Sequence, residues 1–297
     1  MKNRVIISGI TGFVGKKLKK YLNNNNCVIY SYNRKNLSNQ LISKDIMIHL
    51  AGKAHDLKKS SNWEDYYQSN YKLTKRIYDD FLKSDTKKFI FVSSIKAVKD
   101  SYSGILSEEI IPDPKTHYGK SKLLAEKYIF ENVPQNKKVY ILRPSLIYGE
   151  GIKGNLSFLI RMIKKGFPWI FASFKNQRTF CSVHNISFVI KKLINNNSVK
   201  SGIYNVCDDD SISTNDLVKI ISNKLEKKIL FIKIPTIIIK MLFKVGDIFN
   251  LSNFNSNKLK KLTESYKVSN KKIKKYLKIN QMPVKIKTGF NKLITPN

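Results

Sequence analysis

A tyrosine and a lysine stand four residues apart in the segment Tyr118–Lys122, which reads YGKSK. On a helix this spacing places the two side chains on one face. A phenol is a poor base at its ordinary pKa of about 10, and a nearby ammonium group favours the phenolate. Ser93 and Ser94 end an apolar run upstream, so a serine hydroxyl could bridge the tyrosine and a substrate oxygen. These residues predict acid–base chemistry at an oxygen atom.

A glycine-rich turn follows the first apolar run, Val5–Ser8, and precedes an amphipathic segment. In a strand–turn–helix setting the first glycine permits a tight turn and the second lets the backbone approach a pyrophosphate. The third lets the helix pack closely on the sheet. The residues of this turn that are predicted to bind a dinucleotide cofactor are Gly9, Thr11, Gly12, Phe13, Val14 and Gly15.

The residues after the second predicted strand, Val28–Tyr32, bear on the choice of cofactor. A site selective for NAD would show a carboxylate there, but the sequence reads Asn33-Arg34-Lys35. A basic pair suits a 2′-phosphate, so the sequence favours NADP over NAD, with Asn33 and Arg34 as cofactor-binding residues. The alternative is that the pair reflects only the abundance of basic residues in the chain.

Strands and helices alternate through the first half of the sequence. Strands are predicted at Val5–Ser8, Val28–Tyr32, Asp45–Ala51, Lys88–Ser94 and Val139–Arg143, and helices over Gly12–Leu22, Trp63–Lys83 and onward from Tyr118. This alternation predicts the α/β class, with a Rossmann doubly wound parallel sheet and a smaller mixed α/β C-terminal domain. We expect residues 1–150, with a returning part at about 184–206, to form the cofactor domain, and residues 151–183 and 207–297 the substrate domain.

The connection between Arg34 and Asp45 is short. Only ten residues separate them, whereas a full Rossmann half needs about thirty for a helix, a third strand and a second connection. At most a vestigial strand near Leu37 and one helical turn would fit. The adenine-binding side of the site is therefore predicted to be reduced.

Lysine dominates the charge of the chain. Its 55 Lys and Arg residues against 21 Asp and Glu give a formal net charge of +34. Such a charge is typical of nucleic-acid-binding proteins, but only six of the basic residues are arginines, and the lysines are spread along the whole sequence. Nucleic-acid recognition is therefore not favoured. A Rossmann protein that senses cofactor or binds RNA through its basic surface is kept as the alternative to an enzyme.

Three cysteines, Cys27, Cys181 and Cys207, are far apart and have no metal-ligand spacing, and the four histidines are scattered. No metal site is predicted. The cysteines are typical of buried thiols in a reducing compartment, which predicts a cytoplasmic protein. Because Arg4–Ser8 already has the pattern of a strand, no signal peptide is predicted.

The most apolar stretch runs from Ile229 to Phe249 and is interrupted by Lys233, Pro235, Lys240 and Lys244. A membrane-spanning helix needs about 20 predominantly apolar residues, so none is predicted. Apolar residues do fall at helical spacing within it. Such a helix could lie at a membrane interface, but a helix that faces the core or a second subunit, in a possible homodimer, is favoured. The residues at helical spacing are Ile237, Ile238, Met241, Leu242 and Val245.

Taken together, these motifs resemble the extended short-chain dehydrogenase/reductases of the NAD-dependent epimerase/dehydratase family. The resemblance covers nearly the whole chain and rests on GITGFVG, IHLAGKAH, SNYKLT with Asn70, FVSSIKA, YGKSK, RPSLIYG, QRTFCSVHNI and YNVCDDDSIST. Within the family, HLAGKAH, SSIKA, GEGIKGNL and KLTESYKVSN are similar to bacterial enzymes that make N-acetylated sugar nucleotides for surface polysaccharides. That subgroup contains 4-epimerases and 4-keto-6-deoxyhexosamine reductases.

The resemblance implies a role for each matching residue. Ser94, Tyr118 and Lys122 would be catalytic, with Lys122 also holding the nicotinamide ribose. The substrate would be a UDP-hexose or UDP-N-acetylhexosamine, or its 4-keto-6-deoxy derivative. The residues implied along the cofactor are Leu50, Ala51, Gly52 and Lys53, and those implied at the substrate are Ser94, Lys96, Asn155 and Arg178, the last two at its diphosphate. Arg143 is equally compatible with a site near the pyrophosphate and with a structural role.

One departure from the family pattern narrows the set of reactions that the chain is expected to catalyse. The 4,6-dehydratases of this family need an Asp–Glu pair directly after the strand-end hydroxyl, and here Ile95 and Lys96 follow Ser94. The chain therefore lacks the groups that eliminate water, which leaves hydride transfer at C4 as the predicted reaction. Whether it is an epimerase or a ketoreductase stays open.

Overall fold

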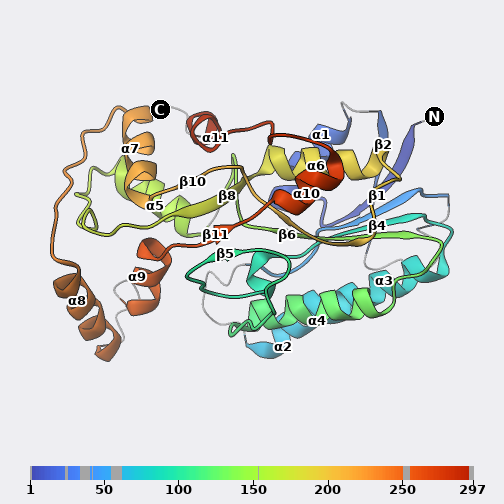
Figure 1. The fold of residues 1–297 in the computed structure, drawn as a ribbon, viewed down its shortest axis with the longest axis horizontal. Helices are drawn as coiled ribbons and strands as arrows, with labels where there is room; N and C mark the ends of the chain where they lie inside the picture. Colours follow the sequence, from blue (N-terminus) through green and yellow to red (C-terminus); the bar gives the residue numbers. More distant parts are fainter. Residues whose placement is uncertain are drawn as a thin grey trace.

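A computed structural model of the chain describes residues 2–23, 26–33, 41, 43–54, 62–152, 154–249 and 255–293, without the side chains of Asn155 and Asn257. Its centre is a six-stranded sheet in the order β2-β1-β3-β4-β6-β9, in which every neighbouring pair is parallel (Figure 1). The strands are β1 (Asn3–Ser8), β2 (Cys27–Ser31), β3 (Ile46–His49), β4 (Lys88–Val92), β6 (Lys138–Pro144) and β9 (Gly202–Val206).

Helices cover both faces of this sheet. Figure 1 shows α1, α6 and α10 on one face and α2, α3 and α4 on the other. The central strands β3 and β4 are buried along their whole length, as expected where helices lie on both sides of a parallel sheet. The predicted doubly wound α/β fold is therefore confirmed. The helices are α1 (Phe13–Asn23), α6 (Val183–Asn195) and α10 (Lys271–Leu277), and α2 (Trp63–Tyr66), α3 (Leu73–Lys83) and α4 (His117–Glu131).

Strand β2 forms one edge of the sheet in the part of the chain that the structure describes. Val28 and Tyr30 on this strand are exposed, and the Lys44 ammonium lies 3.9 Å from the centroid of the Tyr30 ring. The expected vestigial strand near Leu37 falls on residues outside those described, as does Arg34.

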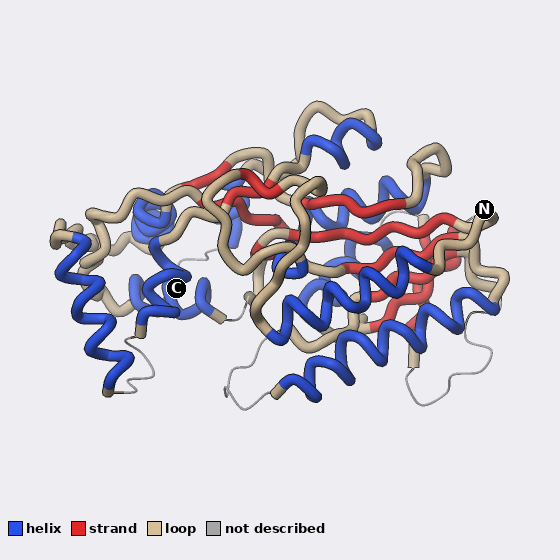
Figure 2. The backbone as a smooth tube through the Cα atoms, turned by 60° about the horizontal axis from the view of Figure 1, so that its bottom comes forward, coloured by secondary structure: helices blue, strands red, loops and turns tan. Residues whose placement is uncertain are grey.

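The second half of the chain adds a separate apolar cluster beside the sheet. It gathers side chains such as Tyr148, Trp169, Phe180 and Phe290, and the Tyr148 and Phe290 rings stack with centroids 4.2 Å apart. Figure 2 shows the helices of this half that do not cover the sheet grouped toward one end of the molecule, away from the long strands. The elements are β7 (Leu146–Tyr148), β8 (Arg178–Ser182) and β10 (Ser211–Ile212) in one small sheet, the pair β5 (Ile105–Leu106) and β11 (Lys267–Val268), and helices α5 (Asn155–Lys164), α7 (Thr214–Lys224), α8 (Thr236–Ile248), α9 (Ser256–Thr263) and α11 (Ile286–Leu293).

Two lysine side chains bind the carbonyl groups at the ends of helices. The Lys88 ammonium donates hydrogen bonds to the carbonyl oxygens of Leu193, Ile194 and Asn196, at 2.9, 2.6 and 3.3 Å, where α6 ends. Lys137 does the same for α3, at the carbonyl oxygens of Phe81, Leu82 and Ser84. The last carbonyl groups of a helix have no partner within it and carry partial negative charge. These two lysines therefore cap helices, unlike the solvated lysines expected from the composition.

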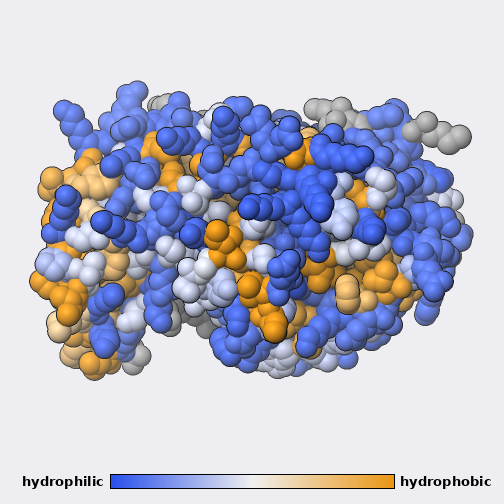
Figure 3. Space-filling model, viewed as in Figure 1, coloured by the Kyte–Doolittle hydropathy of each residue, from blue (hydrophilic) through white to orange (hydrophobic). Residues whose placement is uncertain are grey.

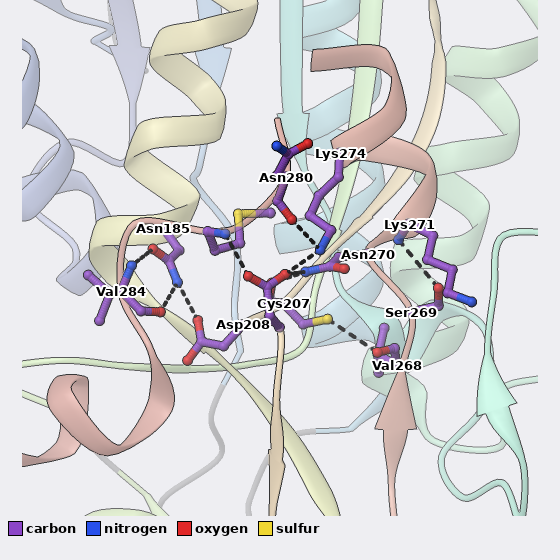
Figure 4. Close-up of polar contacts among 12 residues, drawn as sticks. Asn185, Cys207, Asp208, Val268, Ser269, Asn270, Lys271, Lys274, Asn280 and Val284 are labelled. Atoms are coloured by element: carbon purple, nitrogen blue, oxygen red, sulfur yellow. Dashed lines mark hydrogen bonds and ion pairs between the residues drawn. The ribbon is translucent and has the colours of Figure 1, made fainter. Parts of the chain in front are cut away.

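A polar network ties the C-terminal segment to the sheet (Figure 4). One carboxylate oxygen of Asp208 accepts from the Asn185 side chain at 2.6 Å, and Asn185 pairs with the Val284 backbone. Asn270 donates to the Cys207 carbonyl oxygen at 2.9 Å. Burial raises the pKa of Asp208 to about 6. The aspartates after β9 thus hold neighbouring segments together.

Two further expectations concern cysteines and metals. The three cysteines are free and buried, which confirms the prediction of buried thiols. Within the described ranges the structure contains no group of three potential metal-ligating side chains.

Candidate active site

The turn after β1 exposes backbone at the start of α1. Gly9 has a φ of 75°, in the left-handed region. A Cβ on Gly9 would come within 2.7 Å of the Ala51 nitrogen, and one on Gly15 within 2.3 Å of the Gly9 carbonyl oxygen. The Gly12 N–H donates to that oxygen at 3.0 Å. Bare backbone at a helix N-terminus is where a phosphate group binds, so this turn fits the pyrophosphate of a dinucleotide.

The site lies where the strand order of the sheet reverses. The chain leaves β1 for β2 on one side and returns to β3 on the other. Ligands of open α/β sheets bind outside the carboxyl ends of the strands at such a switch point. Gly9 after β1 and Ala51 after β3 meet there. The structure thereby brings the glycine turn and the predicted cofactor segment, Leu50 to Lys53, to the same edge of the sheet.

The side chain of Asn70 holds the segment Leu50–Lys53 in place through the backbone of Lys53. It lies in the π-helical turn η1 (Tyr67–Lys72) and is fully buried. Its oxygen accepts from the Lys53 N–H at 2.7 Å, and its nitrogen donates to the Lys53 carbonyl at 3.1 Å and to the Ser121 hydroxyl at 3.0 Å. A Cβ on Gly52 would meet Asn70 at 2.7 Å and the Lys122 ammonium at 3.4 Å. One amide thus holds the backbone after β3 beside the start of α4.

His49 and Thr74 support this arrangement. The His49 ring lies 2.5 Å from the Ser8 hydroxyl through Nδ1 and 2.8 Å from the Thr74 hydroxyl through Nε2. The Thr74 hydroxyl also donates to the Asn70 carbonyl oxygen. Sequence reasoning did not assign Thr74 or Ser121. The available signal was the pair Asn70 and Thr74, two polar residues four apart on the buried side of a helix.

The three predicted catalytic residues lie at the same edge of the sheet. Ser94 follows β4 and caps the short 3₁₀ turn η2 (Ile95–Ala97). Tyr118 lies in the first turn of α4, which begins after Thr116, whose hydroxyl accepts from the Gly119 N–H. The Lys122 ammonium, one turn further, donates to the Val92 carbonyl oxygen at 3.2 Å.

The pKa of Tyr118 differs from the one that the sequence predicts, and the pKa of Lys122 is shifted as well. Burial raises the pKa of Tyr118, and the hydrogen bond with the Ser94 hydroxyl only partly opposes it. Burial also lowers the pKa of Lys122 to about 8, against the charge of Glu126. The sequence led us to expect a Tyr118 pKa lowered by Lys122. In this structure desolvation has the larger effect, and the lysine is bonded to Val92.

The positively charged side chains of Lys96 and Arg178 lie close enough to interact. The Lys96 ammonium donates to the Asp100 carbonyl oxygen at 2.5 Å and lies 4.4 Å from the centroid of the Tyr266 ring. Burial lowers the pKa of Lys96 to about 8; the charge of Asp100 opposes this shift and the nearby positive charge of Arg178 contributes to it. Arg178 opens β8 and donates to the Lys261 carbonyl oxygen. Because Lys96 follows Ser94 by two residues, these two side chains adjoin the predicted catalytic residues.

Arg143 has a structural partner. Its guanidinium forms a forked pair with the Glu126 carboxylate, with a shortest distance of 2.6 Å, and the two side chains are 3% and 1% exposed. Of the two readings of Arg143, the structure supports the structural one.

The other residues predicted to bind cofactor or substrate lie after β2 and at the starts of α1 and α5. Asn33 is exposed at the end of β2, and Arg34 lies outside the described residues. Asn155 is the first residue of α5, and its side chain is among those not described. Thr11 and Gly12 are exposed, and Phe13 and Val14 half-buried, at the start of α1.

The fold and the glycine turn are those of a dinucleotide-binding Rossmann protein. The family model described as NAD dependent epimerase/dehydratase family matches residues 5–207. The chain therefore belongs to the NAD-dependent epimerase/dehydratase family. This confirms the predicted class of enzyme and the use of a nicotinamide dinucleotide. No helix among the described residues is long and apolar enough to cross a membrane.

Relatives and solved structures agree with this assignment. A UDP-glucose 4-epimerase of Vibrio cholerae is 28% identical over 79% of this chain and 80% of its own length. N-acetyl-α-D-glucosaminyl-diphospho-ditrans,octacis-undecaprenol 4-epimerase of Escherichia coli O157:H7 is 27% identical over 95% of this chain and 87% of its own. The crystal structure of a UDP-N-acetylglucosamine 4-epimerase from Bacillus cereus superposes with a TM-score of 0.76, at 19% identity, over 98% of this chain and 95% of that one.

Proposed function

We propose that this protein is a 4-epimerase of a diphosphate-linked sugar, with a UDP-hexose or UDP-N-acetylhexosamine as substrate, in surface polysaccharide biosynthesis in the cytoplasm. The observation that carries the proposal is that the Ser94 and Tyr118 hydroxyls are hydrogen-bonded, while the Lys122 ammonium, one turn from Tyr118, lies beside the Gly52 backbone at the switch point of the sheet. A 4-ketoreductase of a 4-keto-6-deoxy sugar is the second candidate. The names of both curated relatives favour the epimerase.

Each residue has a task in this reaction. When bound, the dinucleotide supplies the hydride acceptor and donor for C4. In its phenolate form, which the Lys122 ammonium favours, the Tyr118 oxygen takes the proton of the C4 hydroxyl and returns it, and the Ser94 hydroxyl keeps the C4 oxygen within reach of Tyr118. Lys122 binds the nicotinamide ribose. The absence of a carboxylate pair at Ile95 and Lys96 supports chemistry at C4 without loss of water.

The substrate side is proposed to be residues 151–183 and 207–297, with residues 1–150 and about 184–206 on the cofactor side. Arg178, Lys96 and Asn155 would hold the diphosphate, and the proximity of the two positively charged side chains of Arg178 and Lys96 supports this. The two curated relatives are named for different groups beyond the diphosphate, a nucleoside in one and a polyprenol in the other. The glycosyl diphosphate is the part in common.

The direct test follows the configuration at C4. Purified protein is incubated with UDP-glucose, UDP-N-acetylglucosamine or polyprenyl-diphosphate-N-acetylglucosamine, with NAD or NADP, and the sugar protons are followed by NMR. Conversion to the C4 epimer without net consumption of cofactor would support the proposal. Oxidation of NADPH with a 4-keto-6-deoxy sugar, and no epimerisation, would support the ketoreductase instead. Absence of turnover on all of these would contradict both.

Removing Arg178 should weaken substrate binding. A charge-assisted bond to the diphosphate contributes about 1.5–3 kcal/mol, so Arg178→Ala should raise KM about tenfold to a hundredfold. Lys192→Ala is the matched control, because Lys192 is an exposed lysine on α6. Arg178→Lys keeps the charge but loses the fork, and should lie between the two. Equal KM values for all these variants would show that Arg178 is not at the diphosphate.

We expect tighter binding of NADPH than of NADH. The reason is the Asn33-Arg34-Lys35 sequence, which has basic residues where an NAD-selective site has a carboxylate. Arg34→Ala should remove most of the difference between the two dissociation constants, measured by fluorescence or calorimetric titration. If NADH binds as well as NADPH to the wild-type protein, the basic pair has no part in cofactor choice.

A further inference from the structure

Helix α8 presents an apolar face to solvent. One side of the helix is buried through Ile239, Phe243 and Gly246, and Ile239 and Phe243 belong to the apolar cluster beside the sheet that also contains Tyr148 and Phe290. In Figure 3 hydrophobic side chains gather at the end of the molecule where Figure 1 draws α8. The exposed apolar residues of α8 and of the residue that ends it, each between 46% and 75% exposed, are Ile237, Ile238, Met241, Leu242, Val245, Ile248 and Phe249.

The exposed face is larger than the buried one. A helix at the surface of a globular protein normally has one apolar stripe and a polar opposite face. In α8 the charged residues are confined to a narrow strip that contains Lys240, Lys244 and Asp247. Five of the seven exposed apolar residues are those whose helical spacing was noted in the sequence. The expectation that they face the core is wrong, because Ile239, Phe243 and Gly246 take that side. Contiguous exposed apolar surface of this kind marks an interaction site.

The charge around this face is almost entirely positive. Residues 227–261 contain eight lysines and a single acidic residue, Asp247. The Asp247 carboxylate accepts a hydrogen bond from the Ser256 N–H at 3.0 Å, which links α8 to the start of α9. Lys240 and Lys244 lie one turn apart at the edge of the apolar face, and α9, which packs on α8, carries Lys260 and Lys261.

The exposed apolar face of α8 and the lysines around it together determine which partner can bind there. A second copy of the chain would bring two lysine-rich rims together within molecules that each carry a formal charge of +34. Like charges at an interface cost free energy, and Asp247 offers little to offset them. A bilayer with anionic head groups supplies both an apolar interior and negative charge. An apolar helix face flanked by lysines is what binds such a surface.

We propose that α8 docks the protein on the surface of an anionic lipid bilayer. The helix lies in the plane of the membrane, with Ile238, Met241 and Val245 at the boundary between head groups and acyl chains. Lys240 and Lys244 contact the head groups. The inference goes beyond the proposed function and does not depend on it, because binding to lipid requires no turnover.

Vesicle binding tests the proposal. Wild-type protein is mixed with vesicles of phosphatidylglycerol and phosphatidylcholine, or of phosphatidylcholine alone, and the bound fraction is measured by sedimentation over a range of salt. Because the whole chain is basic, charge alone would bring some protein to the anionic vesicles. The decisive variant is therefore M241Q/L242Q/V245Q, which keeps every charge and uses a good helix former. It should bind at least about tenfold more weakly than the wild type.

A control variant separates this effect from a general loss of apolar surface. Ile111 and Phe130 are exposed hydrophobic residues outside α8, so I111Q/F130Q should bind vesicles like the wild type. Tryptophan at position 241 reports insertion. With anionic vesicles the emission of M241W should shift to shorter wavelength and be shielded from a water-soluble quencher, and that of I111W should not.

Three outcomes would overturn the proposal. The first is wild-type protein that does not sediment with anionic vesicles, and the second is equal binding by M241Q/L242Q/V245Q. The third is a wild-type dimer, measured by light scattering without lipid, that this triple variant converts to a monomer, since α8 would then be a subunit interface. Circular dichroism establishes that the variants are folded, and their turnover of a UDP-sugar reports separately on the proposed function.

Discussion

Replacement of Tyr118 by phenylalanine should lower kcat at least about a hundredfold. The change removes one hydroxyl and with it the proposed proton exchange with the C4 oxygen, and a rate loss of this size is typical of the loss of a general acid or base. The ring itself remains, so its contact with Tyr66, with centroids 6.2 Å apart, is kept. Cofactor affinity and the melting curve should therefore change little. The measurement is initial rate at saturating substrate, with cofactor titration alongside.

Tyr128→Phe is the matched control for this experiment. Tyr128 lies on the same helix, α4, and its hydroxyl interacts with Asp79 and Lys75 at the surface, on the far part of the helix. Loss of that hydroxyl should leave kcat unchanged. If the kcat values of Tyr118→Phe and Tyr128→Phe are both close to that of the wild type, the proposed mechanism is refuted.

The second large effect is on stability. Arg143→Met should lower the free energy of unfolding by about 3–5 kcal/mol, because it leaves the Glu126 carboxylate buried without its partner. Replacing both residues, in Arg143→Met with Glu126→Leu, should recover much of this loss, since no unpaired charge remains. Urea denaturation followed by circular dichroism measures the difference.

An exposed ion pair provides the comparison. Arg4 and Asp45 form a salt bridge of 2.9 Å with side chains 46% and 39% exposed, so Arg4→Met should cost only about 0–1 kcal/mol. If Arg143→Met costs no more than Arg4→Met, the buried pair does not contribute as argued. A loss of substrate affinity in the stable double variant, with cofactor affinity retained, would instead support a binding role for Arg143.

Much of the fold follows from local patterns in the sequence. The strand β4 is an apolar run after Lys88 and is buried throughout, and the glycine turn stands at the strand–helix junction that its spacing predicts. The Tyr118–Lys122 spacing likewise predicts one helix face. Each of these signals depends on residues close together in the chain, so a single sequence is enough to recognise it.

Other features depend on partners that the sequence does not pair. Arg143 and Glu126 are 17 residues apart on different elements, and only the packing of α4 on β6 brings them together. The two-residue strands β5 and β11 are too short to show a period. The pKa of Tyr118 depends on how completely α2 and α4 exclude water. Such properties arise from tertiary packing, which residue spacing does not encode.

The π-helical turn at Tyr67–Lys72 limits how this enzyme can vary. A π-turn holds one residue more than the α-helical turn it replaces, and such turns occur frequently at functional sites. Deleting one residue there would restore an α-helix and rotate Asn70 by about 100° relative to α3. The amide would then leave Gly52 and Ser121, although every chemical group of the site was still present. The length of this helix is therefore under stronger constraint than the identity of its outward side chains, and insertions or deletions should be tolerated elsewhere first.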